Sequence, residues 1–164
     1  MVTATKKALP AKRRASAKTP DAVALLRADH QRVSALFADY EGTRSAAKKK
    51  QIVSQICTEL TVHAQVEEEL FYPAVKQALK DKMLVPEATV EHATLKGLIA
   101  QVEGQTPSGE MFDAIVKVLS EYVKHHVKEE QGEMVPKARA SRLDLAALGQ
   151  QIATRKAELL AARA

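Results

Sequence analysis

Apolar residues recur along most of the chain at alternating spacings of three and four, the period of an amphipathic α-helix with one buried face. The first stripe of this kind consists of Leu26, His30, Val33, Phe37 and Tyr40. Thr19-Pro20-Asp21 before it is typical of a helix start, and Glu41-Gly42 after it is typical of a helix end. The pattern therefore predicts a helix over residues 21–42.

Three further stripes have the same period, and each predicts another helix. The second, in a helix expected to stop near Lys82, consists of Ile56, Leu60, His63, Glu67, Leu70 and Ala74. The third, in a helix opened by Pro86 and closed by residues 104–109, consists of Ala88, His92, Leu95, Ile99 and Val102. The fourth, in a helix that Pro136 should end or kink, consists of Phe112, Ile115, Leu119, Tyr122, His126 and Glu130.

Four amphipathic helices with short connections predict an all-α, up-down four-helix bundle. A last Ala- and Leu-rich segment predicts an additional C-terminal helix packed on the bundle, through Leu145, Leu148, Ile152 and either Leu159 or Leu160. We expect a disordered basic tail over residues 1–20, the bundle over residues 21–136 and the C-terminal helix within residues 137–164. Hydrophobic residues make up 46% of the chain, which contains no Trp, and this composition agrees with a helical protein.

The chain contains a repeat at an offset of 62 to 63 residues. Asp29-His30 recurs as Glu91-His92, His63-x-x-x-Glu67 recurs as His126-x-x-x-Glu130, and Pro73 recurs as Pro136. The bundle is therefore predicted to consist of two similar helical hairpins. Such a duplication predicts a roughly two-fold site between the hairpins.

Histidines and glutamates stand in these stripes where a bundle normally has Leu or Ile. An unpaired buried carboxylate costs several kcal/mol, so residues of this kind need a common partner. A metal cluster satisfies imidazoles and carboxylates together, and a His and a Glu four residues apart project from one helical face. The candidate ligands are His30, His63, Glu67, His92, His126 and Glu130. Six ligands exceed a tetrahedral zinc site and favour two carboxylate-bridged iron ions, with a hydrogen-bonded polar core or a zinc or manganese site as the alternatives.

Four segments of the chain resemble the hemerythrin, or HHE cation-binding, family. They are residues 29–30, HisAlaGlnValGluGluGluLeuPheTyrPro at 63–73, residues 91–92, and HisValLysGluGluGlnGlyGluMetValPro at 126–136. The resemblance implies a non-haem di-iron centre, oxo- or hydroxo-bridged, with Glu67 and Glu130 as bridging ligands and the four histidines as terminal ligands.

One position departs from the oxygen-carrying hemerythrins, which have a His-x-x-x-His pair on the third helix. The residues four before and four after His92 are Ala88 and Lys96. One iron position is then open, filled by water or taken by another side chain. This departure favours sensing, iron handling, or peroxide and nitric oxide chemistry over reversible oxygen carriage.

Several neighbouring residues have simpler interpretations. Of the adjacent His125 and His126, the spacing to Glu130 selects His126 for the core. Glu68, Glu69 and Glu129 are expected to face solvent, with a contact from Glu68 or Glu129 to a ligand histidine as the alternative. Tyr72 and Tyr122 are interpreted as core aromatics rather than ligands.

The formal net charge of +5 comes from the first twenty residues, which contain six basic and no acidic residues and leave 19 basic against 20 acidic ones beyond. This tail is interpreted as a solubilising segment, with contact to nucleic acid or a mitochondrial presequence as alternatives. The single Cys57 is interpreted as a core residue in a reducing compartment. No apolar run approaches a membrane span, so a cytoplasmic location is expected.

The leading functional hypothesis is an iron protein that binds or senses oxygen, nitric oxide, peroxide or iron itself. We expect apolar walls from Leu26, Phe37, Leu60 and Leu119 to shelter the bound molecule. A di-iron enzyme with peroxidase-like, catalase-like or NO-reducing activity is the first alternative. A stress-linked nucleic-acid protein that uses the basic tail is the second. The sequence makes no prediction of an oligomeric state.

Overall fold

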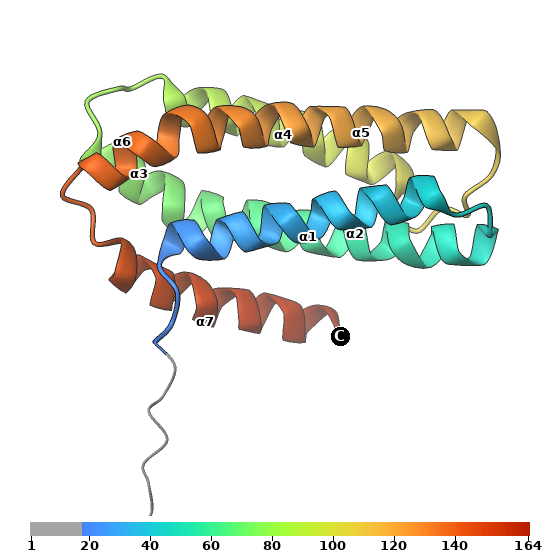
Figure 1. Ribbon diagram of the computed structural model, residues 1–164, viewed down its shortest axis with the longest axis horizontal. Helices are drawn as coiled ribbons and strands as arrows, with labels where there is room; N and C mark the ends of the chain where they lie inside the picture. The colour runs from blue at the N-terminus through green and yellow to red at the C-terminus, as the bar shows by residue number, and fades with distance from the viewer. Residues whose placement is uncertain (1–17) are drawn as a thin grey trace, which may run out of the picture.

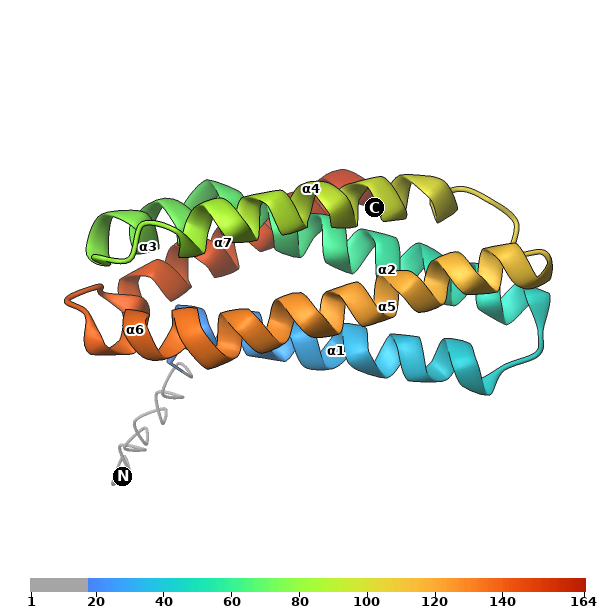
Figure 2. The same ribbon diagram turned by 90° about the horizontal axis from the view of Figure 1, so that it is seen from above.

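The computed structural model describes residues 18–164, so most of the predicted tail lies outside the described residues. The described chain is helical, and its longer helices run alongside one another (Figures 1 and 2). The first hairpin comprises α1 (Ala22–Gly42), α2 (Ala46–Val66), a π-helical turn η1 (Glu67–Phe71) and α3 (Tyr72–Ala78). The second comprises α4 (Leu84–Val102), α5 (Gly109–Glu129), a π-helical turn η2 (Glu130–Met134) and α6 (Val135–Ala140), and α7 (Leu145–Arg163) follows. The predicted all-α bundle with an added C-terminal helix is confirmed.

Side chains directly before three helices fix where those helices begin. Asp21 accepts a hydrogen bond from the backbone N–H of Ala24 (2.8 Å), and Asp144 accepts one from Ala147 (2.9 Å). Ser45 caps α2 in the same way. Each such cap satisfies a backbone donor that the first turn leaves free, a contribution of about 1 kcal/mol.

The two π-helical turns occupy equivalent places in the two hairpins. Each begins at a candidate ligand, Glu67 or Glu130, and each is followed by a proline near the start of the next helix, Pro73 or Pro136. A π-turn hydrogen bond spans five residues, as from the N–H of Tyr72 to the carbonyl of Glu67. A proline lacks an N–H group and would disrupt an α-helix at this point, but the wider π-turn accommodates it. The chain therefore stays helical beyond Pro136, as far as Ala140, and Figure 1 shows the ribbon changing direction into α6.

The buried faces of α1 and α4 agree with the predicted stripes, but two corrections apply elsewhere. From the end of η1 into α3 the buried face includes Phe71 and Val75, whereas the predicted Leu70 and Ala74 are half-buried. The extra residue in the π-turn shifts the buried face by one position. In α5 the core contains Val116 and Val123, and the predicted Ile115 and Tyr122 lie half-buried at its edge.

The helix predicted to stop near Lys82 ends earlier, at Ala78. Leu79 leaves the helical conformation, and its side chain remains buried. The ammonium group of Lys82 donates to the backbone carbonyls of Lys76 (3.0 Å) and Leu79 (2.8 Å). Lys82 therefore caps the end of α3 from outside the helix.

Helix α7 packs on α1, α2 and η1 (Figure 1). It buries Leu148 and Ile152, as predicted, whereas Leu145, Leu159 and Leu160 are half-buried. A Cβ atom at Gly149 would lie 2.5 Å from the backbone oxygen of Pro20, so only glycine permits this approach to the start of α1.

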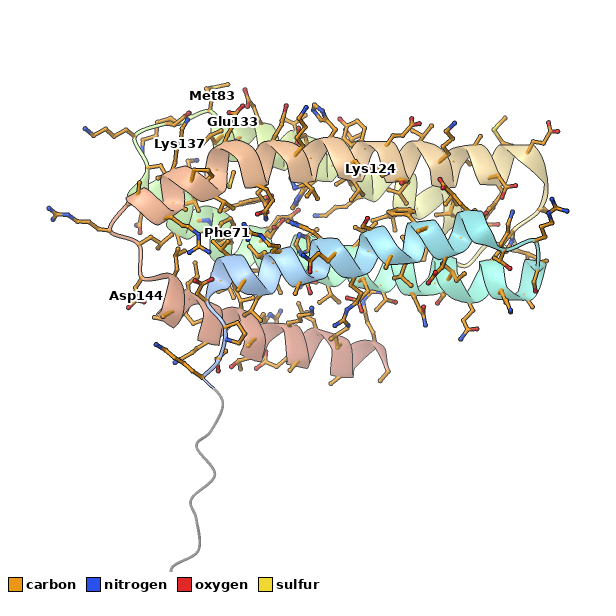
Figure 3. The ribbon with its side chains drawn as sticks, in the orientation of Figure 1. Phe71, Met83, Lys124, Glu133, Lys137 and Asp144 are labelled. Carbon is orange, nitrogen blue, oxygen red and sulfur yellow. The ribbon has the colours of Figure 1, made fainter. Side chains whose placement is uncertain are left out.

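The apolar core is divided into two clusters. One, at the end of the bundle near α3 and α6, includes Leu26, Phe71 and Ile152. The other includes Phe37 and Leu119. In Figure 3 Phe71 points into the bundle, whereas Lys124, Glu133 and Lys137 lie on its outside. Along each of the four bundle helices the candidate ligands fall between members of the two clusters, so a polar layer separates them.

None of the helices within residues 18–164 combines the length and apolar character needed to cross a membrane.

Candidate metal centre

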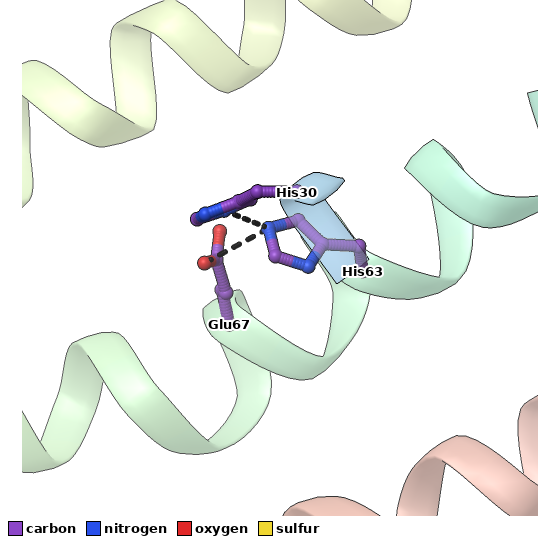
Figure 4. A group of neighbouring side chains, drawn as sticks. All are labelled: His30, His63 and Glu67. Atoms are coloured by element: carbon purple, nitrogen blue, oxygen red, sulfur yellow. Dashed lines mark hydrogen bonds and ion pairs between the residues drawn. The ribbon is translucent and has the colours of Figure 1, made fainter. Parts of the chain in front are cut away.

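The structure brings the four predicted histidines together as two pairs. The Nε2 atoms of His30 and His63 lie 3.1 Å apart, and those of His92 and His126 lie 3.2 Å apart. Figure 4 shows the first pair beside Glu67. Each pair combines one histidine from each helix of a hairpin, α1 with α2 and α4 with α5. The arrangement therefore has the two-fold character that the repeat predicts.

The two predicted glutamates connect these pairs. Glu67 Oε1 lies 3.0 Å from Nε2 of His63, and its Oε2 lies 3.1 Å from Nε2 of His92. Glu130 Oε1 lies 3.5 Å from Nε2 of His30, and its Oε2 lies 3.5 Å from Nε2 of His126. Each carboxylate thus faces both histidine pairs, with one oxygen toward each.

Both carboxylates are left short of hydrogen bonds. Glu67 is fully buried and Glu130 is 3% exposed. The Oε1 atoms of both residues accept no hydrogen bond from any residue in the described part of the chain. Glu67 Oε1 is in ionic contact with His63, but without hydrogen-bond geometry. Buried carboxylate oxygens of this kind are costly unless a cation coordinates them.

Tyr72 is a site residue that the sequence interpretation missed. Its ring is part of the core, but its hydroxyl oxygen lies 3.0 Å from Glu67 Oε2 and 3.1 Å from Glu130 Oε2. The same oxygen lies 3.0 Å from Nε2 of His92 and 3.3 Å from Nε2 of His126. Burial and the two carboxylates raise the pKa of Tyr72 well above its usual value. A protonated phenol therefore stands amid four candidate ligand atoms.

The position of Tyr72 bears on the missing histidine of the third helix. Ala88 is buried in the apolar core, and Lys96 points to Glu68, with 2.7 Å between Nζ and Oε2. Neither residue supplies a ligand atom to the candidate groups of the described chain. The phenol of Tyr72 lies instead on the His92–His126 side of the centre.

Three of the four histidines are held on their outer side by a carboxylate. Nδ1 of His63 lies 3.3 Å from Oδ2 of Asp29, and Nδ1 of His126 contacts Glu91. Nδ1 of His92 lies 3.0 Å from Oε1 of Glu68. An outer hydrogen bond of this kind fixes a histidine's ring orientation and directs Nε2 inward.

The expectation that the Glu68 side chain faces solvent was wrong, because its carboxylate contacts both His92 and Lys96. The alternative expectation, that Glu68 contacts a candidate ligand histidine, agrees with the structure. The outer partner of His30 is the amide of Gln131, 3.2 Å from Nδ1, and Arg27 donates to the oxygen of that amide.

The charges of the histidines differ. Burial opposes the charged form of His63, but Glu67 and Asp29 outweigh it and raise its pKa to about 10. Burial likewise opposes charge on His126, where Glu130 and Glu67 raise the pKa to about 9. Burial and the neighbouring His63 lower the pKa of His30 to about 3. His63 and His126 therefore carry a positive charge at neutral pH, whereas His30 is neutral.

The carboxylates are also unlike each other. Burial opposes ionisation of Glu67, but His63 and His92 hold its pKa well below its usual value. Burial and the negative charge of Glu67 raise the pKa of Glu130. A divalent cation between the two carboxylates would remove this repulsion.

Three residues that were predicted to lie outside the ligand set do lie outside it. His125 is exposed, as expected, and lies 3.2 Å from Glu129. Glu69 is also exposed and pairs with Arg155 on α7 (2.7 Å). Tyr122 lies at the core edge. These residues supply nothing to the histidine pairs.

A small apolar cavity adjoins the centre. All four histidines contribute to its wall, and the apolar lining residues are Val33, Leu60, Ala64, Leu95, Ile99, Val123 and Val127. Of the four expected wall residues, Leu60 lines this cavity, whereas Leu26, Phe37 and Leu119 do not and pack only within the core clusters. The cavity volume of about 20 Å³ is enough for one or two water-sized molecules.

An acidic groove reaches the centre from the other side. It is lined by Glu87, Glu91, Glu129 and Glu133 from α4, α5 and η2, and both His126 and Glu130 contribute to its lining. Carboxylates concentrated in a groove attract cations.

The donor atoms form two groups that can each hold a metal ion. One consists of His30, His63 and Glu67, and the other of Glu67, His92 and His126, with the ligand atoms of each group within 4.8 Å of one another. Glu67 belongs to both groups. Nitrogen and oxygen donors in this number suit a pair of transition-metal ions.

Comparison with known proteins agrees with this geometry. A "DNA nickase" of Nostoc sp. (strain PCC 7120 / SAG 25.82 / UTEX 2576) is 30% identical over 110 residues, 67% of this chain. The chain spans only 31% of the length of that relative. The crystal structure of a hemerythrin HHE cation binding domain-containing protein from Mycobacterium kansasii has the same fold, with a TM-score of 0.72 and 21% identity over 85% of this chain and 87% of that one.

The hemerythrin HHE cation binding domain family matches residues 21–138, which contain both hairpins except the end of α6, and all six candidate ligands. This match covers well over half of the chain. The chain belongs to the hemerythrin HHE cation-binding family.

Proposed function

We propose that this protein binds two iron ions between its hairpins, at His30, His63, Glu67, His92, His126 and Glu130. One observation carries the proposal: two buried carboxylates each face both histidine pairs and each keep one oxygen without a hydrogen bond from the described residues. Both of these oxygens face the His30–His63 pair, and a cation there satisfies them. A second cation at the His92–His126 pair takes the Oε2 atoms, which the Tyr72 hydroxyl contacts in the metal-free protein. The two ions also replace the extra protons on His63 and His126.

The ligands divide between the two ion positions. His30 and His63 belong to the first position, and His92 and His126 belong to the second, while Glu67 and Glu130 bridge the two. Tyr72 supplies a phenol oxygen on the second side, where the third helix lacks another histidine. Hard oxygen donors combined with imidazoles favour iron over copper, and this many ligands exceed a tetrahedral zinc site.

The adjoining cavity defines the class of molecule that the ions bind. Its walls are mostly apolar and its volume of about 20 Å³ admits a diatomic molecule or peroxide but no larger organic substrate. Iron in such a place supplies binding or redox chemistry toward oxygen, nitric oxide or peroxide. The protein's own residues exclude water and hold the imidazoles in position.

The ligand assignment is tested by titrating the metal-free protein with Fe(II) under anaerobic conditions. We expect about two ions per chain for the wild type, and one or none after His63→Ala or Glu130→Ala. Glu121→Ala is the matched control, because that glutamate is exposed on α5, the helix that leads to Glu130, and it should keep both ions. Two ions in the His63 and Glu130 variants would refute the assignment.

Contact with DNA is a second candidate function. It is supported by the relative named a DNA nickase and by the five basic residues among residues 1–17, which include no acid. Basic residues of this kind act on phosphates without reading sequence.

DNA contact predicts salt-dependent binding that depends on the tail. With five phosphate contacts, the logarithm of the affinity should fall with that of the salt concentration at a slope of roughly 4 to 5. Deleting residues 1–17 should abolish binding in a mobility-shift assay with duplex DNA while leaving iron content unchanged. Equal retention of the full and shortened chains would exclude this candidate.

A further inference from the structure

Helix α7 contacts the candidate centre through one residue, Lys156. Its ammonium group pairs with Oδ1 of Asp29, while Oδ2 of the same carboxylate lies 3.3 Å from Nδ1 of His63. Asp29 is 5% exposed. A continuous line of contacts therefore joins α7, which lies beyond the family-matched residues 21–138, to a candidate ligand.

The repeat provides an internal comparison. In the second hairpin, Glu91 takes the place of Asp29 and contacts Nδ1 of His126. The outer partner of Glu91 is His125, 3.6 Å away, and no lysine or arginine in residues 18–164 pairs with Glu91. Only the first of the two equivalent carboxylates thus has a cation from an added helix.

The contact of Lys156 is also better sheltered than the other outer contacts. The Lys156 side chain is 18% exposed, whereas that of Lys96, the outer partner of Glu68, is 50% exposed. A sheltered ion pair is less screened by solvent and holds its carboxylate more firmly than an exposed pair does.

We infer that Lys156 is a positioning residue that orients His63 through Asp29, so that α7 makes the two ion positions unequal and strengthens the one at His30 and His63. The inference rests on the proposed two-ion centre. Lys156 fixes the direction of the Asp29 carboxylate, and Asp29 fixes the imidazole with Nε2 inward. Outer partners of metal-binding histidines typically change metal affinity 10- to 100-fold.

The test is Fe(II) titration of the metal-free full-length protein after Lys156→Met. We expect one ion to bind with the wild-type affinity and the other about tenfold or more weakly. Arg155→Met is the matched control, because Arg155 is the neighbouring residue of α7 and pairs at the surface with Glu69. It should leave both affinities unchanged, and Lys156→Arg should restore most of the lost affinity.

Two further variants separate positioning from general destabilisation. Asp29→Asn should weaken the same ion, and adding Lys156→Met to it should cause little further loss, because both changes break one line of contacts. Asp29→Asn by itself provides the test if Lys156→Met does not fold.

Unchanged affinities in the Lys156→Met protein, or equal losses at both positions, would overturn the inference while leaving the two-ion centre intact. A wild-type protein that does not bind two ions would instead refute the proposed function itself.

Discussion

At the scale of single residues, the inner surface of the centre depends on groups that hold each imidazole from outside. Asp29, Glu91 and Glu68 each contact the Nδ1 atom of one histidine, which leaves Nε2 for the interior. Tyr72 adds a phenol to that interior. The geometry of the centre therefore depends on about ten residues, because the groups that orient the six candidate ligands matter as well as the ligands themselves.

Replacement of Tyr72 by Phe tests the role of its hydroxyl. Without iron, the change removes the one O–H group of the structurally described chain that lies within hydrogen-bond distance of both buried carboxylates, and it should lower the free energy of unfolding by about 1–3 kcal/mol. With ferric iron, loss of the phenolate should remove a visible charge-transfer band. Urea denaturation and the absorption spectrum measure the two effects. Tyr122→Phe, at the core edge, should change neither, and an unaltered spectrum in the Tyr72 variant would exclude the phenol as a ligand.

The six candidate ligands could be predicted because each hairpin places them at helical spacings of three and four. Tyr72 could not be found in this way, because it follows Glu67 by five residues, and in an α-helix that offset turns a side chain by about 140°. The π-turn brings the phenol back to the same face. The contacts of Glu68 with His92 and of Lys156 with Asp29 join different helices, and the helical period of the sequence does not predict how helices pack on one another.

At the scale of elements, the π-turns decide the register of the helices that follow them. Helix period predicted all four bundle helices. Its buried positions failed where the pitch changes, so that Phe71 and Val75 replace Leu70 and Ala74 in the core. They also failed within α5, where the core contains the neighbours of Ile115 and Tyr122. The end of α3 was also missed, because Lys82 caps it through space rather than by a sequence signal within the helix.

Two glycines should respond oppositely to substitution by Ala. A Cβ at Gly132, within η2, would meet no atom within 4 Å, so Gly132→Ala should stabilise the fold by about 0.4–1 kcal/mol. A Cβ at Gly149 would collide with backbone atoms of residues 20–22, so the same change there should destabilise it. Thermal unfolding of the two variants measures the difference, and loss of stability at Gly132 would mean that η2 depends on glycine.

Ile152 should account for much of the attachment of α7. Its side chain is 1% exposed among core residues of the bundle. Ile152→Ala should cost about 2–5 kcal/mol of unfolding free energy through lost burial and a new cavity. Leu160→Ala, at a half-buried position of the same helix, should cost less. Equal losses of stability in the two variants would mean that Ile152 is not the main apolar contact between α7 and the bundle.

At the scale of the whole molecule, metal binding and folding are coupled to protons. The metal-free protein should be most stable near pH 6.5 and lose stability toward pH 10. A histidine with a raised pKa stabilises the fold fully below its unfolded pKa of about 6.5. This contribution is lost as the pH rises through the folded values, about 9 for His126 and about 10 for His63.

His30 acts in the opposite direction at lower pH. Its pKa of about 3 keeps it neutral in the fold, whereas the unfolded chain gains a proton below about pH 6.5, so stability should also fall as the pH falls. Urea denaturation of the metal-free protein from pH 5 to 10 measures the loss of stability on both the acidic and the alkaline side. The iron-loaded protein should lack the alkaline loss, because metal ions have already displaced the protons. A flat profile for the metal-free protein would contradict this charge assignment.

The two-ion centre is tested most directly by the iron environment in the loaded protein, measured by X-ray absorption at the iron edge. We expect a first shell of nitrogen and oxygen donors and a second iron at roughly 3 to 4 Å, the spacing of a bridged pair. A single isolated iron without an iron neighbour would rule out a pair of ions bridged by Glu67 and Glu130.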